Sequence, residues 1–350
     1  MRRFLKPAAG LTCLLAVTTT GCSAESEGTS DAAPAAPERQ NAPPNGATAP
    51  PTKPTKPTEP VTTYAPYVSA TDASGNDSTG SPATYNLAFV IADGGDCAPR
   101  WDGSRAIGDS AVKSRIAKLK KDGATVRVSF GGALGKELAA TCDSASELAE
   151  AYGKALDAAG STQADFDIEG DELSDAGSVA VRSEAIAALQ RERPDLEVSF
   201  TLPVMPSGLN TDSVALLESA NEYEVRVSTV NLMTMNYGES YGGDMGGYAI
   251  SAAKAAHPQL KKVFGLSDAN AWRGMALTSM IGVNDVDGET FTLSDAAQVR
   301  AFAEKQGIGW VSMWSAVRDQ RCEKGTAKKA QTDCSGVEQS SGAFANAFAG

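Results

Sequence analysis

The chain has 350 residues, 31 of them basic and 43 acidic, and a formal net charge of −12 at pH 7. This acidic balance argues against nucleic acid or an anionic membrane surface as a partner, because both require clustered Lys and Arg. The single histidine, His257, would have to serve any histidine-dependent hydrolysis or zinc site. Its place beside Pro258 predicts instead a surface residue at a helix end. Carboxylates are therefore the acid–base groups to expect, with no metal and no cofactor.

The N-terminal 61 residues predict an export signal followed by a linker. A short positive segment precedes the apolar run Leu11–Val17, which is too short to span a membrane, so residues 1–22 are predicted to be a signal peptide. The run Thr19-Thr20-Gly21-Cys22 resembles a bacterial lipobox, in which Cys22 carries the lipid; ordinary signal cleavage nearby is the alternative. Residues 23–61 are rich in Ala, Pro and Thr and predict a disordered spacer. We expect a protein that is secreted or lipid-anchored at the bacterial cell surface, with any membrane attachment made through the lipid alone.

Four cysteines follow this segment, and an even number in an exported chain suggests two disulfides. Three pairings are possible. Proximity along the chain favours Cys97–Cys142 and Cys322–Cys334.

Strand and helix patterns then alternate to the C-terminus. Strands are predicted at Thr63–Ser69, Tyr85–Ala92, Thr125–Phe130, Ala164–Glu169, Glu197–Leu202, Val227–Met235, Met275–Ile281 and Ile308–Trp314. Helices are predicted at Asp109–Lys121, Ser144–Ala159, Asp175–Arg193, Thr211–Tyr223, Tyr248–His257 and Ser294–Gln306. Eight strands interleaved with helices predict an α/β fold of the (β/α)₈ TIM-barrel type over residues 62–350. An open doubly wound sheet is the second choice, and the Gly-rich phosphate loop expected after its first strand is missing.

The fourth predicted strand carries the most informative run, Ala164–Gly170. Residues two apart share a face of a strand, so Asp165, Asp167 and Glu169 point to one side while Phe166 and Ile168 point to the other. Barrel active sites lie at the carboxyl ends of strands, which places Glu169, the last strand residue, at the rim of a pocket. A calcium loop also begins Asp-x-Asp-x-Glu-Gly, but its twelfth position, which requires Glu, is Ala176.

Four motifs in order resemble glycoside hydrolase family 18, the chitinases and endo-β-N-acetylglucosaminidases. They are Ser129-Phe130-Gly131-Gly132 at strand three, Asp165-Phe166-Asp167-Ile168-Glu169 at strand four, Met233-Thr234-Met235-Asn236-Tyr237 at strand six and Trp314 at strand eight. The two glycines are expected to let the backbone pass close to the acids.

The resemblance implies a retaining hydrolysis assisted by the 2-acetamido group of the substrate, an exception to the usual scheme of two carboxylates. Glu169 would be the general acid, and Asp167 would accept a hydrogen bond from the acetamido N–H. Tyr237 would donate to the acetamido oxygen, and Asp165 would tune Asp167. The family's further acid, seven residues before Glu169, is Thr162 here, and its strand-six acid is Asn236, so both changes are expected to reduce the local negative charge.

The remaining candidates are expected to bind or line the sugar site. They are Trp314, Asn236, Met235, Tyr241, Met275 and Trp272 for substrate, with Trp101, Asp244 and Asn284 as further lining. Trp310 is expected in the core. The resemblance favours a monomeric chitinase acting on chitin or chitin oligosaccharides. An endo-β-N-acetylglucosaminidase acting on glycoprotein glycans is the alternative, and a non-catalytic chitin-binding barrel is the alternative of another class.

Overall fold

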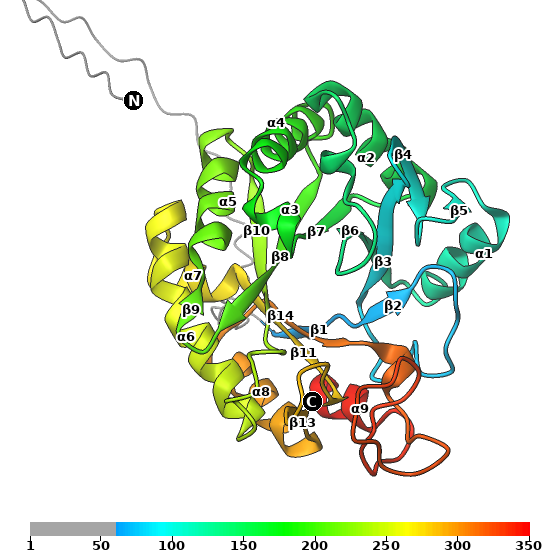
Figure 1. Ribbon diagram of the computed structural model, residues 1–350, viewed down its shortest axis with the longest axis vertical. Coiled ribbons are helices and arrows are strands. Elements are labelled where there is room, and N and C mark those ends of the chain that lie inside the picture. The colour runs from blue at the N-terminus through cyan, green and yellow to red at the C-terminus, as the bar shows by residue number, and fades with distance from the viewer. Residues whose placement is uncertain (1–60) are drawn as a thin grey trace, which may run out of the picture. The chain divides into compact units, whose positions relative to one another are not determined.

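Eight strand positions close into a parallel barrel in the computed structural model, which describes residues 61–350 (Figure 1). The first position is split, because β1 pairs with β14 at one side while β2 pairs with β3 at the other, and this split strand closes the ring. The predicted signal peptide, the lipidation of Cys22 and all but the last residue of the predicted linker lie outside the described residues. The strands, in order around the barrel, are β1 (Thr63–Tyr64) with β2 (Tyr67–Ser69), β3 (Thr84–Asp93), β6 (Thr125–Gly131), β7 (Gln163–Asp167), β8 (Glu197–Met205), β10 (Val227–Met233), β11 (Met275–Met280) and β14 (Trp310–Trp314).

The predicted (β/α)₈ barrel is therefore confirmed, with small shifts in strand ends. The largest consequence is at β7, which ends at Asp167, so the prediction that Glu169 is its last residue is wrong. The Ile168 N–H still donates to the Thr201 carbonyl (3.1 Å), but at Gly170 the chain takes a positive φ of 60° and turns into α3 (Asp171–Ser174). Glu169 thus lies on the loop that follows the strand.

Helices form the layer outside the strands (Figure 1). All six predicted helices are present, and the outer helices are α1 (Ser110–Leu119), α2 (Ala145–Ala159), α4 (Ala176–Glu192), α5 (Thr211–Glu222), α6 (Met245–Phe264), α8 (Leu293–Gln306) and α9 (Ala343–Ala349). Side-chain caps fix the starts of these helices except α9; Asp109, Ser144 and Asp175, for example, accept from the first free N–H groups.

Helix α6 continues past the predicted end at His257, with Pro258 inside it. The expectation of a surface histidine is therefore wrong. His257 is buried, its ring stacks on Trp272 with centroids 4.0 Å apart, and its Nε2 lies 3.0 Å from the Asp268 carbonyl oxygen. This ring thus lies on the buried face of α6, against Trp272.

Short elements that the sequence did not suggest decorate both ends of the barrel. They are β4 (Asp96–Trp101), β5 (Arg105–Ala106), β9 (Gly208–Leu209), α7 (Asp268–Arg273), β12 (Gly282–Val283), β13 (Thr290–Phe291) and the 3₁₀ turns η1 (Leu138–Ala140) and η2 (Ala316–Arg318). In residues 61–350 no helix is long and apolar enough to cross a membrane.

The alternation predicted for β7 is realised as an aromatic layer outside and a polar layer inside the barrel. Phe166 stacks on Phe130 of β6 (5.3 Å) and approaches Phe200 of β8 (5.7 Å), and Tyr152 of α2 packs edge-on against Phe166 (5.0 Å). This burial against the helices fixes the register that sends Asp165 and Asp167 inward.

Both predicted disulfides are present. Cys97–Cys142 joins β4 to the segment after η1, and Cys322–Cys334 closes a loop between η2 and α9. Trp310 lies in the core as expected, with the Arg127 guanidinium 4.8 Å from its ring centroid.

A buried ion pair anchors the loop after β6, which forms part of the barrel mouth. Arg182 of α4 donates through Nη2 to Glu137 Oε2 (2.9 Å), and Tyr152 donates to Glu137 Oε1 (2.6 Å). The Glu137 carboxylate also accepts from the Ala139 N–H (2.9 Å). Both charged side chains are almost completely buried, so removing one leaves the other without compensation.

We predict that Glu137→Gln lowers the free energy of unfolding by about 3 kcal/mol, because it leaves the buried Arg182 charge without a counter-charge. The measurement is urea unfolding at neutral pH. Glu150→Gln is the matched control, since Glu150 pairs with Lys154 at the exposed surface and its loss should cost no more than about 0.5 kcal/mol. Equal effects of the two changes would contradict the prediction.

Candidate active site

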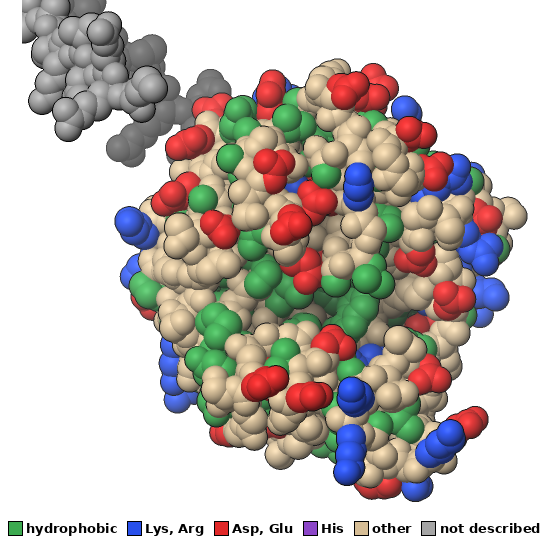
Figure 2. Space-filling view, in the orientation of Figure 1, with side chains coloured by type: hydrophobic (Ala, Val, Ile, Leu, Met, Phe, Trp, Pro, Cys, Tyr) green, Lys and Arg blue, Asp and Glu red, His purple; other side chains and the backbone are tan. Residues whose placement is uncertain are grey.

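The carboxyl ends of the strands surround a hollow with an apolar floor and acidic side chains around it (Figure 2). A cavity of ≈ 110 Å³ lies there, where barrel sites are expected. Of the predicted site residues it brings together Asp167, Glu169, Met235, Asn236 and Trp314. The other lining residues are Tyr67, Phe89, Ala133, Thr201, Met233, Thr278, Met280 and Asp285.

Asp165 lies below this cavity as the centre of a hydroxyl network. Its Oδ2 accepts from the Tyr67 hydroxyl (2.9 Å) and from Ser129 Oγ (2.7 Å). Its Oδ1 accepts from Ser199 Oγ and Thr201 Oγ1, both at 2.8 Å. Four donors from strands β2, β6 and β8 therefore hold one fully buried carboxylate, a group with acceptor sites only.

Asp167 lies two residues further along β7, nearer the mouth, and one of its carboxylate oxygens lacks a hydrogen bond. It is 6% exposed, and its Oδ1 has no hydrogen-bond partner among the described residues. Burial raises the pKa of Asp167 well above its usual range, and the charges of Glu169 and then Asp165 raise it further. This carboxyl thus has a free oxygen at the cavity and a strong tendency to hold a proton.

Glu169 is partly buried at the cavity wall. Burial also raises the pKa of Glu169, with the negative charge of Asp285 as the second cause. A carboxyl that keeps its proton towards neutral pH in a cavity is suited to general-acid chemistry. Asp167 and Glu169 titrate as neighbours, so their protons are linked.

The two glycines after Ser129 have the role that the sequence predicted. Gly131 has a φ of 95°, and a Cβ there would collide with the Asp167 carbonyl oxygen. Gly132 has a φ of 90°, and its N–H donates to that same oxygen (2.9 Å), while a Cβ would lie 2.8 Å from the Phe89 ring. The close approach of β6 to β7 at the cavity therefore requires glycine.

Asn236 and Asp285 are joined at the opposite wall. Asn236 adopts a left-handed φ of 54°, and its Oδ1 accepts from the Asp285 N–H (3.1 Å) while its Nδ2 donates to Asp285 Oδ2 (3.4 Å). The strand-six position has an amide instead of an acid, yet a carboxylate reaches the same cavity from the loop after β11. The replacement of the family's strand-six acid by Asn236 therefore reduces the negative charge at the cavity less than expected.

Aromatic rings build the remaining wall. Trp314, predicted to lie at the sugar site, is only partly buried and stacks near Phe89 with centroids 5.5 Å apart. Tyr67 meets Trp314 edge-on at 5.7 Å. An exposed indole face at the mouth of a barrel offers a flat apolar surface to a ring-shaped ligand.

Tyr237 is outside the cavity lining, so its contact with substrate stays a prediction. Its ring is 5% exposed and packs against Tyr241 (5.8 Å) and Tyr248 (6.2 Å), and its hydroxyl is buried without a partner among the described residues. The left-handed turn at Asn236 breaks the strand alternation just before Tyr237. Tyr241 packs in the same aromatic cluster outside the cavity lining, so its substrate contact also stays a prediction.

Three other predicted contacts are wrong because of their place on the barrel. Met275 is the first residue of β11, at the end away from the cavity, and Met280 at the other end lines it instead. Trp272 lies on α7 before that strand, stacked on His257. Trp101 is fully buried in β4, where its Nε1 donates to the Ile107 carbonyl (3.1 Å).

The three remaining residues that the sequence singled out do not line the cavity. Asp244 caps α6 by accepting from the Gly247 N–H (2.8 Å), and buried Asn284 donates to the Met280 and Gly282 carbonyls. Thr162 precedes β7 and is exposed, at the opposite end of the strand from Glu169. An acid at this position would not face the cavity, so the expected effect of Thr162 on its charge is wrong.

The sequence reasoning missed Tyr67, Phe89, Met280 and Asp285. Three of these, Tyr67, Phe89 and Met280, lie within or at the ends of predicted strands. The rule that barrel active sites lie at the carboxyl ends of strands would have indicated them. Asp285 follows the seventh strand by a few residues, and an acid just after a barrel strand was a usable signal.

No family model matches the chain. Two curated relatives do: "Probable bifunctional chitinase/lysozyme" of Escherichia coli (strain K12), 36% identical over 73% of this chain, and "Endochitinase 11" of Metarhizium anisopliae, 34% identical over 73%. The chain spans 31% and 52% of their respective lengths. The crystal structure of the catalytic domain of a hyperthermophilic chitinase from Pyrococcus furiosus is 31% identical, with a TM-score of 0.73, and covers 83% of this chain and 94% of that one. The chain belongs to glycoside hydrolase family 18. Two of its cavity acids, Asp167 and Glu169, belong to the strand-four motif that first suggested the family.

We predict that Asp167→Asn raises the melting temperature at neutral pH. A carboxyl whose folded pKa lies above its unfolded value of about 3.9 contributes full stability only below that value, and it loses this stability as the pH rises through the folded pKa. The amide has no such loss. Melting curves between pH 3 and 8 should therefore diverge as the pH rises, and curves that diverge towards low pH would contradict the assignment.

Proposed function

We propose that the protein is a chitinase that hydrolyses β-1,4-N-acetylglucosamine linkages with retention of configuration, assisted by the acetamido group of the substrate. The observation that carries the proposal is the pair Asp167 and Glu169 at one cavity, both with raised pKa values. The named relatives and the Pyrococcus structure are chitinases, which supports the same substrate class.

Glu169 supplies the proton to the leaving oxygen. Its raised pKa keeps the acid form available towards neutral pH, and the resulting carboxylate then takes the proton from the incoming water. The position of Glu169 on the loop at the cavity wall supports this role.

Asp167 orients the acetamido group. Its unpartnered Oδ1 accepts the acetamido N–H, and this contact positions the acetamido oxygen to attack the anomeric carbon and stabilises the cation that forms. The hydroxyl network around Asp165 keeps Asp167 at the correct depth. The Tyr237 hydroxyl, which is buried without a partner among the described residues, stays a candidate donor to the acetamido oxygen. Trp314 and Phe89 provide the surface against which the pyranose ring packs.

We further propose that residues 1–22 direct export, that Cys22 carries a lipid, and that residues 23–61 form a spacer to the catalytic barrel. Two disulfides in the barrel support an oxidising compartment. Mass measurement of the mature protein from a bacterial membrane fraction tests the lipid, because acylation at Cys22 adds mass to the N-terminal peptide.

We predict that N-acetylglucosamine tetramers and pentamers are cleaved and that proton NMR early in the reaction shows the β-anomer at the new reducing end. Glu169→Gln should lower kcat by about 10² to 10⁴-fold, because it removes the proton donor, while binding of the oligomers persists.

Three results would contradict the function. Cleavage of a high-mannose glycopeptide but no chitin oligomer would favour an endo-β-N-acetylglucosaminidase. Binding without cleavage by the unaltered protein would favour a non-catalytic barrel. Cleavage of glucose oligomers, which lack the acetamido group, would require a carboxylate nucleophile instead.

We predict that Asp285→Asn moves the alkaline limb of the kcat/KM profile to lower pH. The negative charge of Asp285 raises the pKa of Glu169, so its removal makes the general acid lose its proton at lower pH. Asp285 is exposed, so the shift should shrink as salt is added. Asp287→Asn is the matched control, because Asp287 is exposed on the same loop and lies outside the cavity lining. An unchanged alkaline limb in Asp285→Asn at low salt would contradict the coupling.

A further inference from the structure

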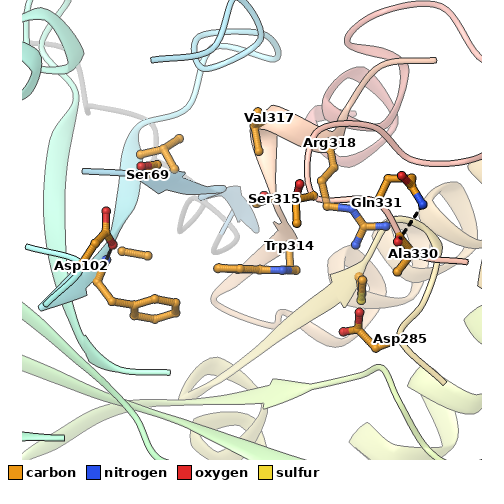
Figure 3. A pocket seen from close by; sticks show the side chains of 14 residues that line it. Ser69, Asp102, Asp285, Trp314, Ser315, Val317, Arg318, Ala330 and Gln331 are labelled. Atoms are coloured by element: carbon orange, nitrogen blue, oxygen red, sulfur yellow. Dashed lines mark hydrogen bonds between the residues drawn. The ribbon is translucent and has the colours of Figure 1, made fainter. Parts of the chain in front are cut away.

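A second cavity of ≈ 240 Å³ adjoins the catalytic cavity. The two share the lining residues Phe89, Met280, Asp285 and Trp314, so they lie next to each other at the indole. Figure 3 shows Trp314 between two walls, with Ser69 and Asp102 on one side and Arg318, Gln331 and Asp285 on the other. A water molecule occupies about 30 Å³ of the liquid, so this cavity has room for a bulky polar group.

Arg318 is the unusual group in this second cavity. It lies in η2 just after β14 and is 1% exposed. Its Nη2 donates to the Val283 carbonyl (2.7 Å), but Nε and Nη1 have no partner among the described residues. A buried charged donor that lacks an acceptor costs free energy, and a ligand oxygen would remove that cost.

The Arg318 guanidinium points towards Asp285 across the cavity, as Figure 3 shows, yet no ion pair joins the two within residues 61–350. Burial lowers the pKa of Arg318 to about 10, so it remains a cation at neutral pH. A donor and an acceptor held apart in one cavity match a neutral ligand group that has both an acceptor and a donor.

The apolar lining narrows the choice of ligand group. Val68, Ala88 and Val317 line the same cavity and offer a surface for a methyl group. An acetamido group combines a carbonyl acceptor, an N–H donor and a methyl group, whereas a hydroxyl lacks the apolar part. A free amine, protonated at neutral pH, has no acceptor for Arg318.

We propose that the second cavity binds the acetamido group of the sugar next to the one that is cleaved, with Arg318 donating to its carbonyl oxygen and Asp285 accepting from its N–H. Arg318 is thereby a specificity-determining residue for acetylated over deacetylated chains. The assignment rests on the proposed chitinase function. One wall of this cavity, formed by Ala330, Gln331 and Thr332, belongs to the loop closed by Cys322–Cys334.

Binding is tested by calorimetry in the Glu169→Gln background with two probes, the fully acetylated N-acetylglucosamine tetramer and the fully deacetylated glucosamine tetramer. Adding Arg318→Met should weaken binding of the acetylated tetramer about tenfold or more, because a hydrogen bond to a charged donor is lost. Binding of the deacetylated tetramer should change less than about twofold. Arg318→Lys should restore part of the loss.

A second pair of variants protects the test against misfolding of Arg318→Met. Ala330→Trp fills the cavity from a loop position and should weaken the acetylated tetramer similarly. Lys328→Trp is the matched control on the same loop, since Lys328 is exposed and lies outside the lining, and it should leave the affinity unchanged.

The outcomes separate the inference from the function on which it rests. Unchanged affinity for the acetylated tetramer in folded Arg318→Met and in Ala330→Trp overturns the inference. Equal weakening of both tetramers by Arg318→Met overturns the assignment to the acetamido group. If Glu169→Gln alone fails to bind the acetylated tetramer and the unaltered protein fails to cleave it, the proposed function itself is overturned.

Discussion

The buried Asp165 carboxylate is the constraint on which the active cavity depends. Four hydroxyls from β2, β6 and β8 converge on its two oxygens, so three strands are tied to β7 below the cavity. Further bonds extend the network, because Asn231 of β10 donates to Thr201 (2.9 Å) and accepts from Thr278 of β11 (2.8 Å). A barrel interior is usually filled with branched apolar side chains, and here a polar network takes their place. Such a network is stable only when all its polar groups are hydrogen-bonded. A shift in strand register would break these hydrogen bonds and is therefore disfavoured.

The negative charge of Asp165 influences the pKa of the neighbouring Asp167. Asp165 places a fixed negative group one strand step below Asp167, and Glu169 and Asp285 add charge from above. The cavity therefore concentrates carboxyls in a protein that is acidic overall, and their mutual repulsion is offset by proton retention. The unsatisfied oxygen of Asp167 and the unsatisfied nitrogens of Arg318 lie in adjoining cavities. Each cavity thus has a buried polar group that a ligand could complete.

The strands and the inward acids were predictable because both depend on local rules. Alternation along Asp165–Glu169 and the aromatic residues between the acids fixed the faces, and the cysteine pairing followed from sequence proximity. The differences from the prediction arose where long-range geometry decides. Tyr237 was assigned to the cavity from the strand-six motif, and the left-handed turn at Asn236 that precedes its ring has no clear sequence signal. The charge of Asp285 acts on Glu169 from another loop, and although the position of Asp285 just after a strand was a usable signal, no local pattern encodes which acid it acts on. Met275 was an avoidable error, since strand direction already placed it at the far end of the barrel.

The loop between Cys322 and Cys334 has a consequence for engineering. The acids of the catalytic cavity depend on strand residues, whereas one wall of the second cavity comes from this loop, whose ends are fixed by a covalent bond. A segment with fixed ends can be exchanged for another of similar length without disturbing the residues that anchor it. The catalytic acids and the exchangeable loop therefore lie in separate parts of the chain. Libraries of sequences between the two cysteines would vary sugar preference while the barrel continues to fold.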